Sequence, residues 1–172
     1  MAEHPPGPDQ EPTVDVLDRQ VHPASLEATL DFARRLAVDL RQGDVVLLDG
    51  DLGAGKSEIA RAMIRALVGE ATEVPSPTFT LVQRYETDYC PITHADLYRI
   101  DDPADLDELG LDEAGDLGIL IVEWPFRAGD DYFPPSALLI RITDEGGERR
   151  TLHLTSPDEG WNHRLAPLIN PE

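Results

Sequence analysis

One stretch decides the fold, Gly50-Asp51-Leu52-Gly53-Ala54-Gly55-Lys56-Ser57, and it matches the pattern G-x-x-x-x-G-K-[S/T]. Glycines in this pattern let consecutive backbone N–H groups turn toward one phosphate group. The apolar run VVLL at residues 45–48 predicts a buried strand before the stretch, and apolar residues at helical spacing in 59–67 predict a helix after it. Strand, glycine-rich loop and helix are together typical of a phosphate-binding loop, so the sequence predicts a nucleotide site here.

Each residue of this loop has an expected task. Lys56 is expected to reach the β- and γ-phosphates, and the Ser57 hydroxyl to ligate Mg²⁺. Lys56 is the only lysine in the chain, so no Asn-Lys-x-Asp guanine-reading motif exists, which favours ATP over GTP. The alternative is a glycine-rich turn that binds nothing. The backbone expected to surround the phosphates is that of Asp51, Leu52, Gly53, Ala54 and Gly55.

The composition indicates one acidic globular domain. A formal net charge of −20 over 172 residues argues against direct contact with polyanionic nucleic acid, so any RNA should be held by a more basic partner. The single cysteine, Cys90, excludes internal disulfides and fits a reducing cytoplasm. No signal-peptide pattern is present, and the longest aliphatic run, residues 119–122, is too short for a bilayer. We therefore expect a cytoplasmic protein with no membrane contact.

Three sections of the chain are expected. Residues 1–12 carry four prolines and few large apolar side chains, which predicts a disordered extension. Residues 13–155 are expected to form the nucleotide-binding domain, and residues 156–172 a weakly structured tail. The predicted fold class is α/β: a three-layer αβα P-loop NTPase domain whose mixed, mainly parallel sheet gains antiparallel hairpin strands.

Further elements follow from residue patterns. Residues 13–17 alternate weakly and predict an edge strand, and apolar residues at helical spacing predict a helix from 26 to 40. Two hairpins are predicted, with strands at 79–85 and 91–97, and at 138–142 and 150–154. Pro103 is expected to start a short helix within residues 101–116, half of which are acidic. That acidic stretch is either a solvated face or a docking surface for a basic partner.

Two candidate site residues follow the glycine-rich loop. Thr78, in Pro75-Ser76-Pro77-Thr78-Phe79, either faces the γ-phosphate as a sensing hydroxyl or belongs to a rigid entry into the next strand. Asp96 ends a predicted strand and is either a Mg²⁺ ligand, direct or through water, or a surface acid. His94 shares the strand face of Asp96 and is interpreted as structural.

Three more candidates come from the second half of the chain. Glu123 follows four aliphatic residues, which place it at the strand edge where α/β sites form. It is a candidate for metal contact or for orienting the attacking water, and the alternative is an ordinary surface residue at a strand end. Trp124 either covers the nucleotide, docks a partner or packs at the rim. Arg149 and Arg150 are a surface pair unless one of them, Arg150 in our assignment, reaches the nucleotide.

Four motifs in this order and spacing resemble the TsaE family, the small ATPases of bacterial tRNA threonylcarbamoyladenosine biosynthesis. The resemblance covers residues 25–155 and rests on the glycine-rich loop, Ser76-Pro77-Thr78-Phe79, His94-Ala95-Asp96-Leu97-Tyr98-Arg99 and Glu123-Trp124. The loop alone is shared by many families, whereas the four motifs together are specific. Ser57 replaces the commoner threonine and keeps the hydroxyl, and Glu58 stands where a small or hydroxylic residue is usual.

The resemblance implies a function and a set of partners. Proteins of this family bind ATP and hydrolyse it slowly alone, and they act on a threonylcarbamoyl transferase complex of TsaB and TsaD type subunits. Hydrolysis is thought to reset that complex between turnovers, and tRNA is contacted only indirectly. Carried onto this chain, the resemblance makes Ser57, Asp96 and Glu123 the surroundings of Mg²⁺, with Lys56, Asp96 and Glu123 catalytic. It also places Thr78 in a nucleotide-responsive segment.

Two other functions fit a phosphate-binding loop. A small-molecule kinase usually carries an arginine-rich lid, and the four arginines between Ser57 and Glu123 are not clustered. The second alternative is a regulatory module that binds nucleotide without turnover.

Overall fold

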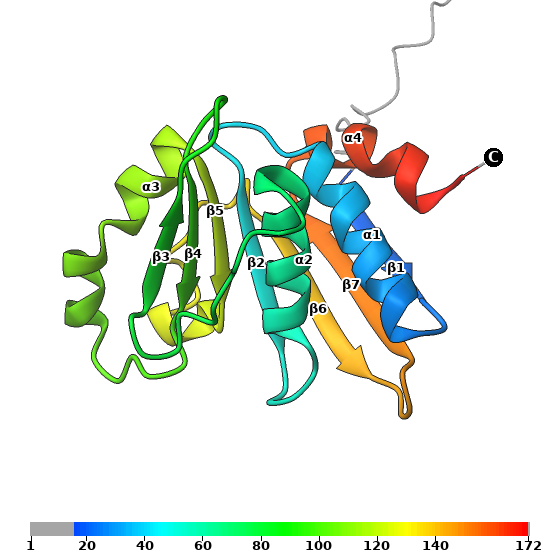
Figure 1. The fold of residues 1–172 in the computed structure, drawn as a ribbon, viewed down its shortest axis with the longest axis horizontal. Coiled ribbons are helices and arrows are strands. Elements are labelled where there is room, and N and C mark those ends of the chain that lie inside the picture. Colours follow the sequence, from blue (N-terminus) through cyan, green and yellow to red (C-terminus); the bar gives the residue numbers. More distant parts are fainter. Residues whose placement is uncertain (1–15, 172) are drawn as a thin grey trace, which may run out of the picture.

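The computed structural model describes residues 16–171 and contains a seven-stranded sheet with helices packed against it (Figure 1). The strands are β1 (Leu17–Val21), β2 (Val45–Gly50), β3 (Val82–Tyr85), β4 (Ile92–Asp96), β5 (Ile119–Glu123), β6 (Leu138–Asp144) and β7 (Arg150–Ser156). The α-helices are α1 (Leu26–Val38), α2 (Lys56–Val68), α3 (Leu111–Leu117) and α4 (Glu159–Ile169). The 3-10 helices are η1 (Pro103–Leu109) and η2 (Pro125–Ala128).

The sheet is mixed, as predicted, with strand order β1-β7-β6-β2-β5-β4-β3. Parallel pairing joins β6 to β2, β2 to β5 and β5 to β4. Antiparallel pairing joins β3 to β4 at one edge, and β6 to β7 and β7 to β1 at the other. Both predicted hairpins are therefore confirmed. The sheet is not mainly parallel as predicted, however, because the antiparallel strands at both edges make three of its six pairings antiparallel.

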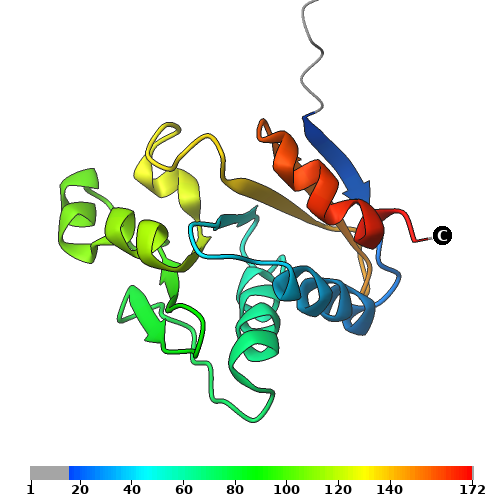
Figure 2. The same cartoon turned by 90° about the horizontal axis from the view of Figure 1, so that it is seen from above.

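Alternation along β2 shows how the sheet separates two apolar cores. Val46 and Leu48 pack in one buried cluster with residues of α1, α2 and α4. Val45 and Leu47, one position out of phase, pack in a second cluster with residues of α3, η1 and η2. Figure 2 shows α1 and α2 on one side of the sheet and η2 on the other. Because β2, β4 and β5 are parallel, their carboxyl ends lie at one edge, where the glycine-rich loop emerges.

The C-terminal segment differs from our expectation. Residues 156–172 were expected to be weakly structured, but β7 extends to Ser156 and α4 occupies Glu159–Ile169. Trp161, Leu165 and Leu168 recur at helical spacing and are buried against the first core, and the Asp158 side chain caps the helix. Pro167 removes only one donor inside the helix, so this apolar face outweighs the proline content that suggested an irregular tail.

Other boundaries shift at the edges of the sheet. The edge strand expected at 13–17 begins at Leu17 and ends at Val21, and the extension expected at 1–12 lies outside the described residues. The strand expected from residue 79 begins at Val82, because residues 77–80 form a turn and Leu81, which follows it, adopts a φ of 64°. The acidic stretch contains both η1 and α3, which bury Leu106 and Leu111 in the second core while their carboxylates face outward.

Candidate functional site

The glycine-rich loop (residues 50–57) joins β2 to α2 and requires glycine at specific positions. Gly55 caps α2 with a left-handed φ of 108°, and Gly53 has a φ of 82°. Residues other than glycine rarely adopt either backbone conformation. At Gly50 the requirement is close approach, since a Cβ atom would lie 2.6 Å from the carbonyl oxygen of Ile142 in β6. The loop is thus held against β6 with its glycines in the conformations a phosphate-binding turn needs.

Lys56 is folded back into the loop at the first turn of α2. Its Nζ donates to the carbonyl oxygens of Gly50, at 2.6 Å, and Asp51, at 2.7 Å. It also lies 4.0 Å from the centre of the Trp124 ring, close enough for a cation–π contact. Burial lowers the pKa of Lys56 below its ordinary value, although neighbouring carboxylates, Glu123 first among them, oppose the shift. The one lysine of the chain is therefore buried in the centre of the loop.

Trp124 has an unusual backbone conformation at this point. Its φ is 56°, in the left-handed region, where a bulky aromatic residue is a rare outlier. Its N–H donates to the carbonyl oxygen of Leu48 in β2, at 3.2 Å, and its ring lies 4.9 Å from that of Tyr98. Such strain costs on the order of 1–3 kcal/mol and clusters at functional sites. The turn holds the indole over Lys56.

Glu123 lies at the end of β5, and both of its carboxylate oxygens are hydrogen-bonded. Its Oε1 accepts from the Ser57 hydroxyl at 2.6 Å, and its Oε2 hydrogen-bonds to Nε2 of His94 in β4 at 2.8 Å. Glu123 and His94 are each 1% exposed. A carboxylate so placed is aimed at the first turn of α2, where the glycine-rich loop meets the helix. The structure thus brings together two predicted site residues, Ser57 and Glu123, that are 66 positions apart in the chain.

Asp96 lies beside Glu123, since the two residues are partners in the parallel pairing of β4 and β5. Its Oδ1 accepts from the Tyr98 N–H at 3.0 Å, and its Oδ2 accepts from the Thr78 hydroxyl at 3.4 Å. Burial raises the pKa of Asp96 above its ordinary value, and the hydrogen bond from Tyr98 opposes the rise. Asp96 is therefore a buried site carboxylate and not a surface acid.

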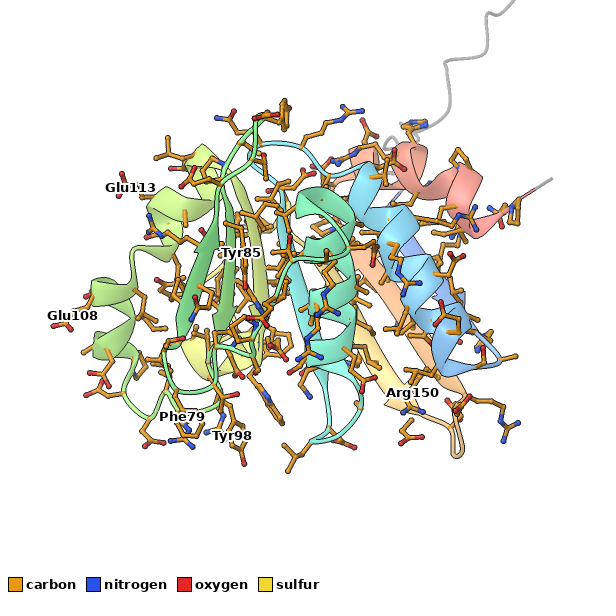
Figure 3. The ribbon with its side chains drawn as sticks, viewed as in Figure 1. Phe79, Tyr85, Tyr98, Glu108, Glu113 and Arg150 are labelled. Carbon is orange, nitrogen blue, oxygen red and sulfur yellow. The ribbon has the colours of Figure 1, made fainter. Side chains whose placement is uncertain are left out.

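Thr78 and Arg150 reach the site from opposite sides of the loop. The Thr78 hydroxyl lies 2.8 Å from that of Ser76 and contacts Asp96, so the proline-flanked segment is tied to β4. Arg150 Nε donates to the carbonyl oxygen of Ala54 at 3.0 Å, whereas Arg149 bonds only within its hairpin. Figure 3 shows Tyr98 and Arg150 at the same end of the molecule.

These residues line one pocket of about 380 Å³. Asp51 and Ala54 do not line it: the carbonyl oxygen of Asp51 accepts from Lys56, and the Ala54 side chain is buried. The pocket combines donors for phosphate with apolar and aromatic surface, as nucleotide sites do. The lining residues are Leu52, Gly53, Gly55, Lys56, Ser57, Glu58, Thr78, Asp96, Tyr98, Glu123, Trp124 and Arg150.

The oxygen donors of the pocket suit a small divalent cation. Ser57, Asp96 and Glu123 offer a hydroxyl and two carboxylates, which are hard ligands of the type Mg²⁺ prefers. Within residues 16–171 no group of three or more His, Cys, Asp and Glu side chains is arranged to hold a metal by itself. A Mg²⁺ ion bound through few protein ligands, water and phosphate oxygens fits this donor set.

Two features of the site escaped sequence reasoning. His94 was interpreted as structural and not as a ligand, but its contact with Glu123 was not predicted, and its Nδ1 is buried without a hydrogen-bond partner among the described residues. Tyr98 was quoted only as part of a motif, yet its ring packs against that of Trp124 at an interplanar angle of 46°. A signal existed for His94 alone, because it shares a strand face with Asp96, whereas Tyr98 lies in the turn after β4.

Comparison with known proteins agrees with these observations. The model of the family described as "Threonylcarbamoyl adenosine biosynthesis protein TsaE" matches residues 23–152. The tRNA threonylcarbamoyladenosine biosynthesis protein TsaE of Rickettsia bellii is 41% identical over 111 residues, 64% of this chain and 77% of that protein. The Bacillus subtilis protein of that name is 35% identical over 139 residues, 80% of this chain and 84% of that protein.

A solved structure extends the likeness to the fold. The crystal structure of Bacillus subtilis YdiB aligns with a TM-score of 0.72 at 28% identity, covering 89% of this chain and 95% of that chain. Among the described residues, no helix has the length and apolar character needed to cross a bilayer. Since the family match spans most of the sequence and all four motifs converge on one pocket, the chain belongs to the TsaE family of threonylcarbamoyl adenosine biosynthesis proteins.

Proposed function

We propose that this protein is an ATP-binding and ATP-hydrolysing subunit, with a P-loop NTPase fold, that acts in the cytoplasm on a threonylcarbamoyl transferase complex of TsaB and TsaD type subunits. That complex modifies the tRNA adenosine next to the anticodon, and ATP hydrolysis resets it between turnovers. The observation that carries the proposal is the chain of contacts from Ser57 to Glu123 to His94 beside the buried Lys56. Family membership supports the pathway.

The binding roles follow from the position of each group. Lys56 and the loop N–H groups hold the phosphates, and Trp124 and Arg150 enclose the nucleotide from two sides of the pocket. Ser57, Asp96 and Glu123 would hold Mg²⁺, which neutralises charge on the phosphates when bound. Lys56 gives up two backbone carbonyl contacts to reach a phosphate, so its displacement from Gly50 and Asp51 accompanies binding.

Hydrolysis depends on how Glu123 is held. With Ser57 on one oxygen and His94 on the other, the carboxylate has a fixed orientation at the loop, suited to metal contact or to orienting the attacking water. Thr78 joins the proline-flanked segment to Asp96, which makes that segment sensitive to what the carboxylate binds. The net charge of −20 argues that the transferase complex, and not this chain, grips the tRNA.

Two variants test the proposal. Glu123→Ala should retain ATP binding but lose phosphate release by about 100-fold or more, because it removes an orienting carboxylate. Lys56→Ala should lose both, because it removes a charge-assisted contact worth about 1.5–3 kcal/mol from a buried site. Calorimetry with ATP and Mg²⁺ measures binding, and phosphate release is measured alone and with the purified transferase complex.

The same assays separate the competing functions. A rise in phosphate release on adding the complex supports the ATPase subunit. ATP consumed only when a small acceptor is added would identify a kinase, and tight binding without turnover under any condition would identify a regulatory module. Undiminished hydrolysis by Glu123→Ala would remove that carboxylate from the mechanism.

A further inference from the structure

Part of one sheet face lacks a covering helix among the described residues. On the face opposite α1 and α2, α3 packs against β4 and β5, and η2 packs against β2. Next to η2 lies a groove of about 420 Å³, lined by β-strand residues such as Leu139 and by Pro125, Phe126 and Phe133. Phe126 is 40% exposed. The groove therefore leaves an aromatic and aliphatic surface open beside the uncovered strands, as docking surfaces do.

A second groove, of about 480 Å³, lies on the other side of the segment 133–135. It runs along α3 and is lined by Leu111 and Tyr132. The two grooves share Phe133, Pro134 and Pro135 as a common ridge. We call the two grooves and this ridge the ridge surface. It offers one mainly apolar groove and, beside it, a second groove whose lining is about equally polar and apolar.

The charged residues of the ridge surface have a single sign. Asp18 and Asp130 line the first groove, and Asp112, Asp116 and Asp131 line the second. No arginine, lysine or histidine lines either groove in the part of the chain that the structure describes. A surface with one apolar groove, whose charged lining residues are all acidic, is complementary to apolar side chains flanked by basic ones. The overall charge of −20 strengthens long-range attraction to such a partner.

Two other occupants fit less well. Residues 1–15 join the described chain at Val16, which lines the first groove, so this segment can reach it. However, that segment has no lysine or arginine and contains the acidic residues Glu3, Asp9, Glu11 and Asp15. Its charge is therefore negative, like that of the groove. A second copy of the chain would bring a further charge of −20 to the same place.

From these observations we propose that the ridge surface docks a basic, apolar segment of the partner complex. The inference rests on the proposed function, since the partner is the transferase complex. It adds which face of this protein would contact that complex. The ridge surface and the nucleotide pocket share no lining residue, but they are adjacent along the chain. Pro125 and Phe126 directly follow Trp124, whose ring covers Lys56, so a partner on η2 adjoins the residue that encloses the nucleotide. Partner and nucleotide should therefore affect each other's affinity reciprocally.

The test measures the dissociation constant between the full chain and the purified TsaB and TsaD type complex, with ATP and Mg²⁺ present. Phe126→Ser removes the exposed aromatic, and the double variant Asp130→Asn with Asp131→Asn removes two edge charges. Each should weaken binding about tenfold or more, as expected for a central interface contact. Added salt should weaken binding of the unaltered protein more steeply than binding of the double variant.

Matched controls lie in the turn between β3 and β4, far along the sheet order. Tyr89→Ser removes an aromatic that is 69% exposed, and Glu86→Gln with Asp88→Asn removes two exposed charges. These variants should bind within about twofold of the unaltered protein, the range expected outside an interface hot spot. Circular dichroism confirms that all variants are folded.

Each contrary result has a distinct meaning. Normal affinity of both ridge variants, with binding by the unaltered protein, would overturn the inference and leave the proposed function standing. No binding by the unaltered protein would overturn both. Tighter binding after deletion of residues 2–15, or self-association that Phe126→Ser abolishes, would assign the surface to the chain's own segment or to a second copy, and would also overturn the inference.

Discussion

The two ends of the neighbouring strands β4 and β5 are built differently. At their carboxyl ends, the paired residues Asp96 and Glu123 are buried together with His94, and Trp124 follows in a left-handed conformation. At their amino ends, the paired residues Ile92 and Ile119 are buried in the first apolar core with Cys90. One pair of strands thus carries buried polar groups and strain at one end, and close apolar packing at the other.

The difference indicates which ends of these strands contribute to the stability of the fold and which to its activity. Buried carboxylates cost folding free energy unless they are hydrogen-bonded, and left-handed aromatic residues add strain. Such features persist where binding or chemistry requires them. The amino ends contribute packing without carrying a site residue. We therefore expect substitutions at the carboxyl ends to affect ATP turnover, and those at the amino ends to affect the free energy of unfolding.

The largest expected stability effect is at the amino end of β5. In Gly118→Ala, the added Cβ would lie 2.0 Å from the carbonyl oxygen of Pro91, an atom of the backbone that cannot rotate away. We expect a loss of about 2–4 kcal/mol in the free energy of unfolding, as for severe overpacking. Urea denaturation measures it, and ATP affinity of the folded fraction should be unchanged.

Gly115→Ala provides the matched control for this prediction. Its added Cβ would lie 3.4 Å from Val45 Cγ2, an ordinary contact, and the helix α3 gains propensity worth about 1 kcal/mol. The control should therefore be neutral or stabilising. Equal stability of Gly118→Ala and the unaltered protein would contradict the comparison between the two ends.

The sequence predicts contacts between residues that are close along the chain better than contacts between distant ones. The glycine-rich loop, its strand and its helix are encoded within residues 45–67, so their local pattern was sufficient. The place of Glu123 at the sheet edge followed from the four aliphatic residues before it. The prediction of a TsaE protein, drawn from four motifs, is confirmed by the family match.

What could not be predicted depends on register and on backbone conformation. The contact of His94 with Glu123 joins residues 29 positions apart and exists only because β4 and β5 pair in one register. The left-handed φ of Trp124 has no residue signal, since glycine and asparagine are the usual indicators. Helix α4 was missed because the prolines of residues 156–172 were given more weight than the apolar spacing of Trp161 and Leu165.

A smaller effect, on turnover alone, is expected at the carboxyl end of β4. His94→Phe removes the donor that holds Oε2 of Glu123, so the carboxylate loses its orientation. Phosphate release should fall about 10- to 100-fold, as when an outer partner of a ligating group is removed, with ATP affinity retained. His94→Gln keeps an N–H donor and should restore part of the rate. Equal loss in both variants, or loss of ATP binding, would indicate a packing role for His94.

The smallest expected effect is on the pH dependence of the free energy of unfolding, and it concerns Cys90 at the amino end of β4. Burial raises the pKa of the Cys90 thiol above its ordinary value of 9.0, with Asp44 adding to the rise and a backbone hydrogen bond from Ile119 opposing it. The folded state therefore retains this proton at pH values where the unfolded chain has begun to release it. By linkage, the contribution of Cys90 to stability is fully present below pH 9.0 and falls as pH rises toward the folded pKa.

Comparison with Cys90→Ala isolates this contribution, because every other titrating group is common to both proteins. We expect the free energy of unfolding to decline more between pH 8 and pH 10 for the unaltered protein than for the variant, with urea denaturation under reducing conditions as the measurement. Identical slopes would show that the thiol is as well solvated in the folded state as in the unfolded chain. The dry apolar packing ascribed to the amino ends of β4 and β5 would then be wrong, since Cys90 lies within that cluster.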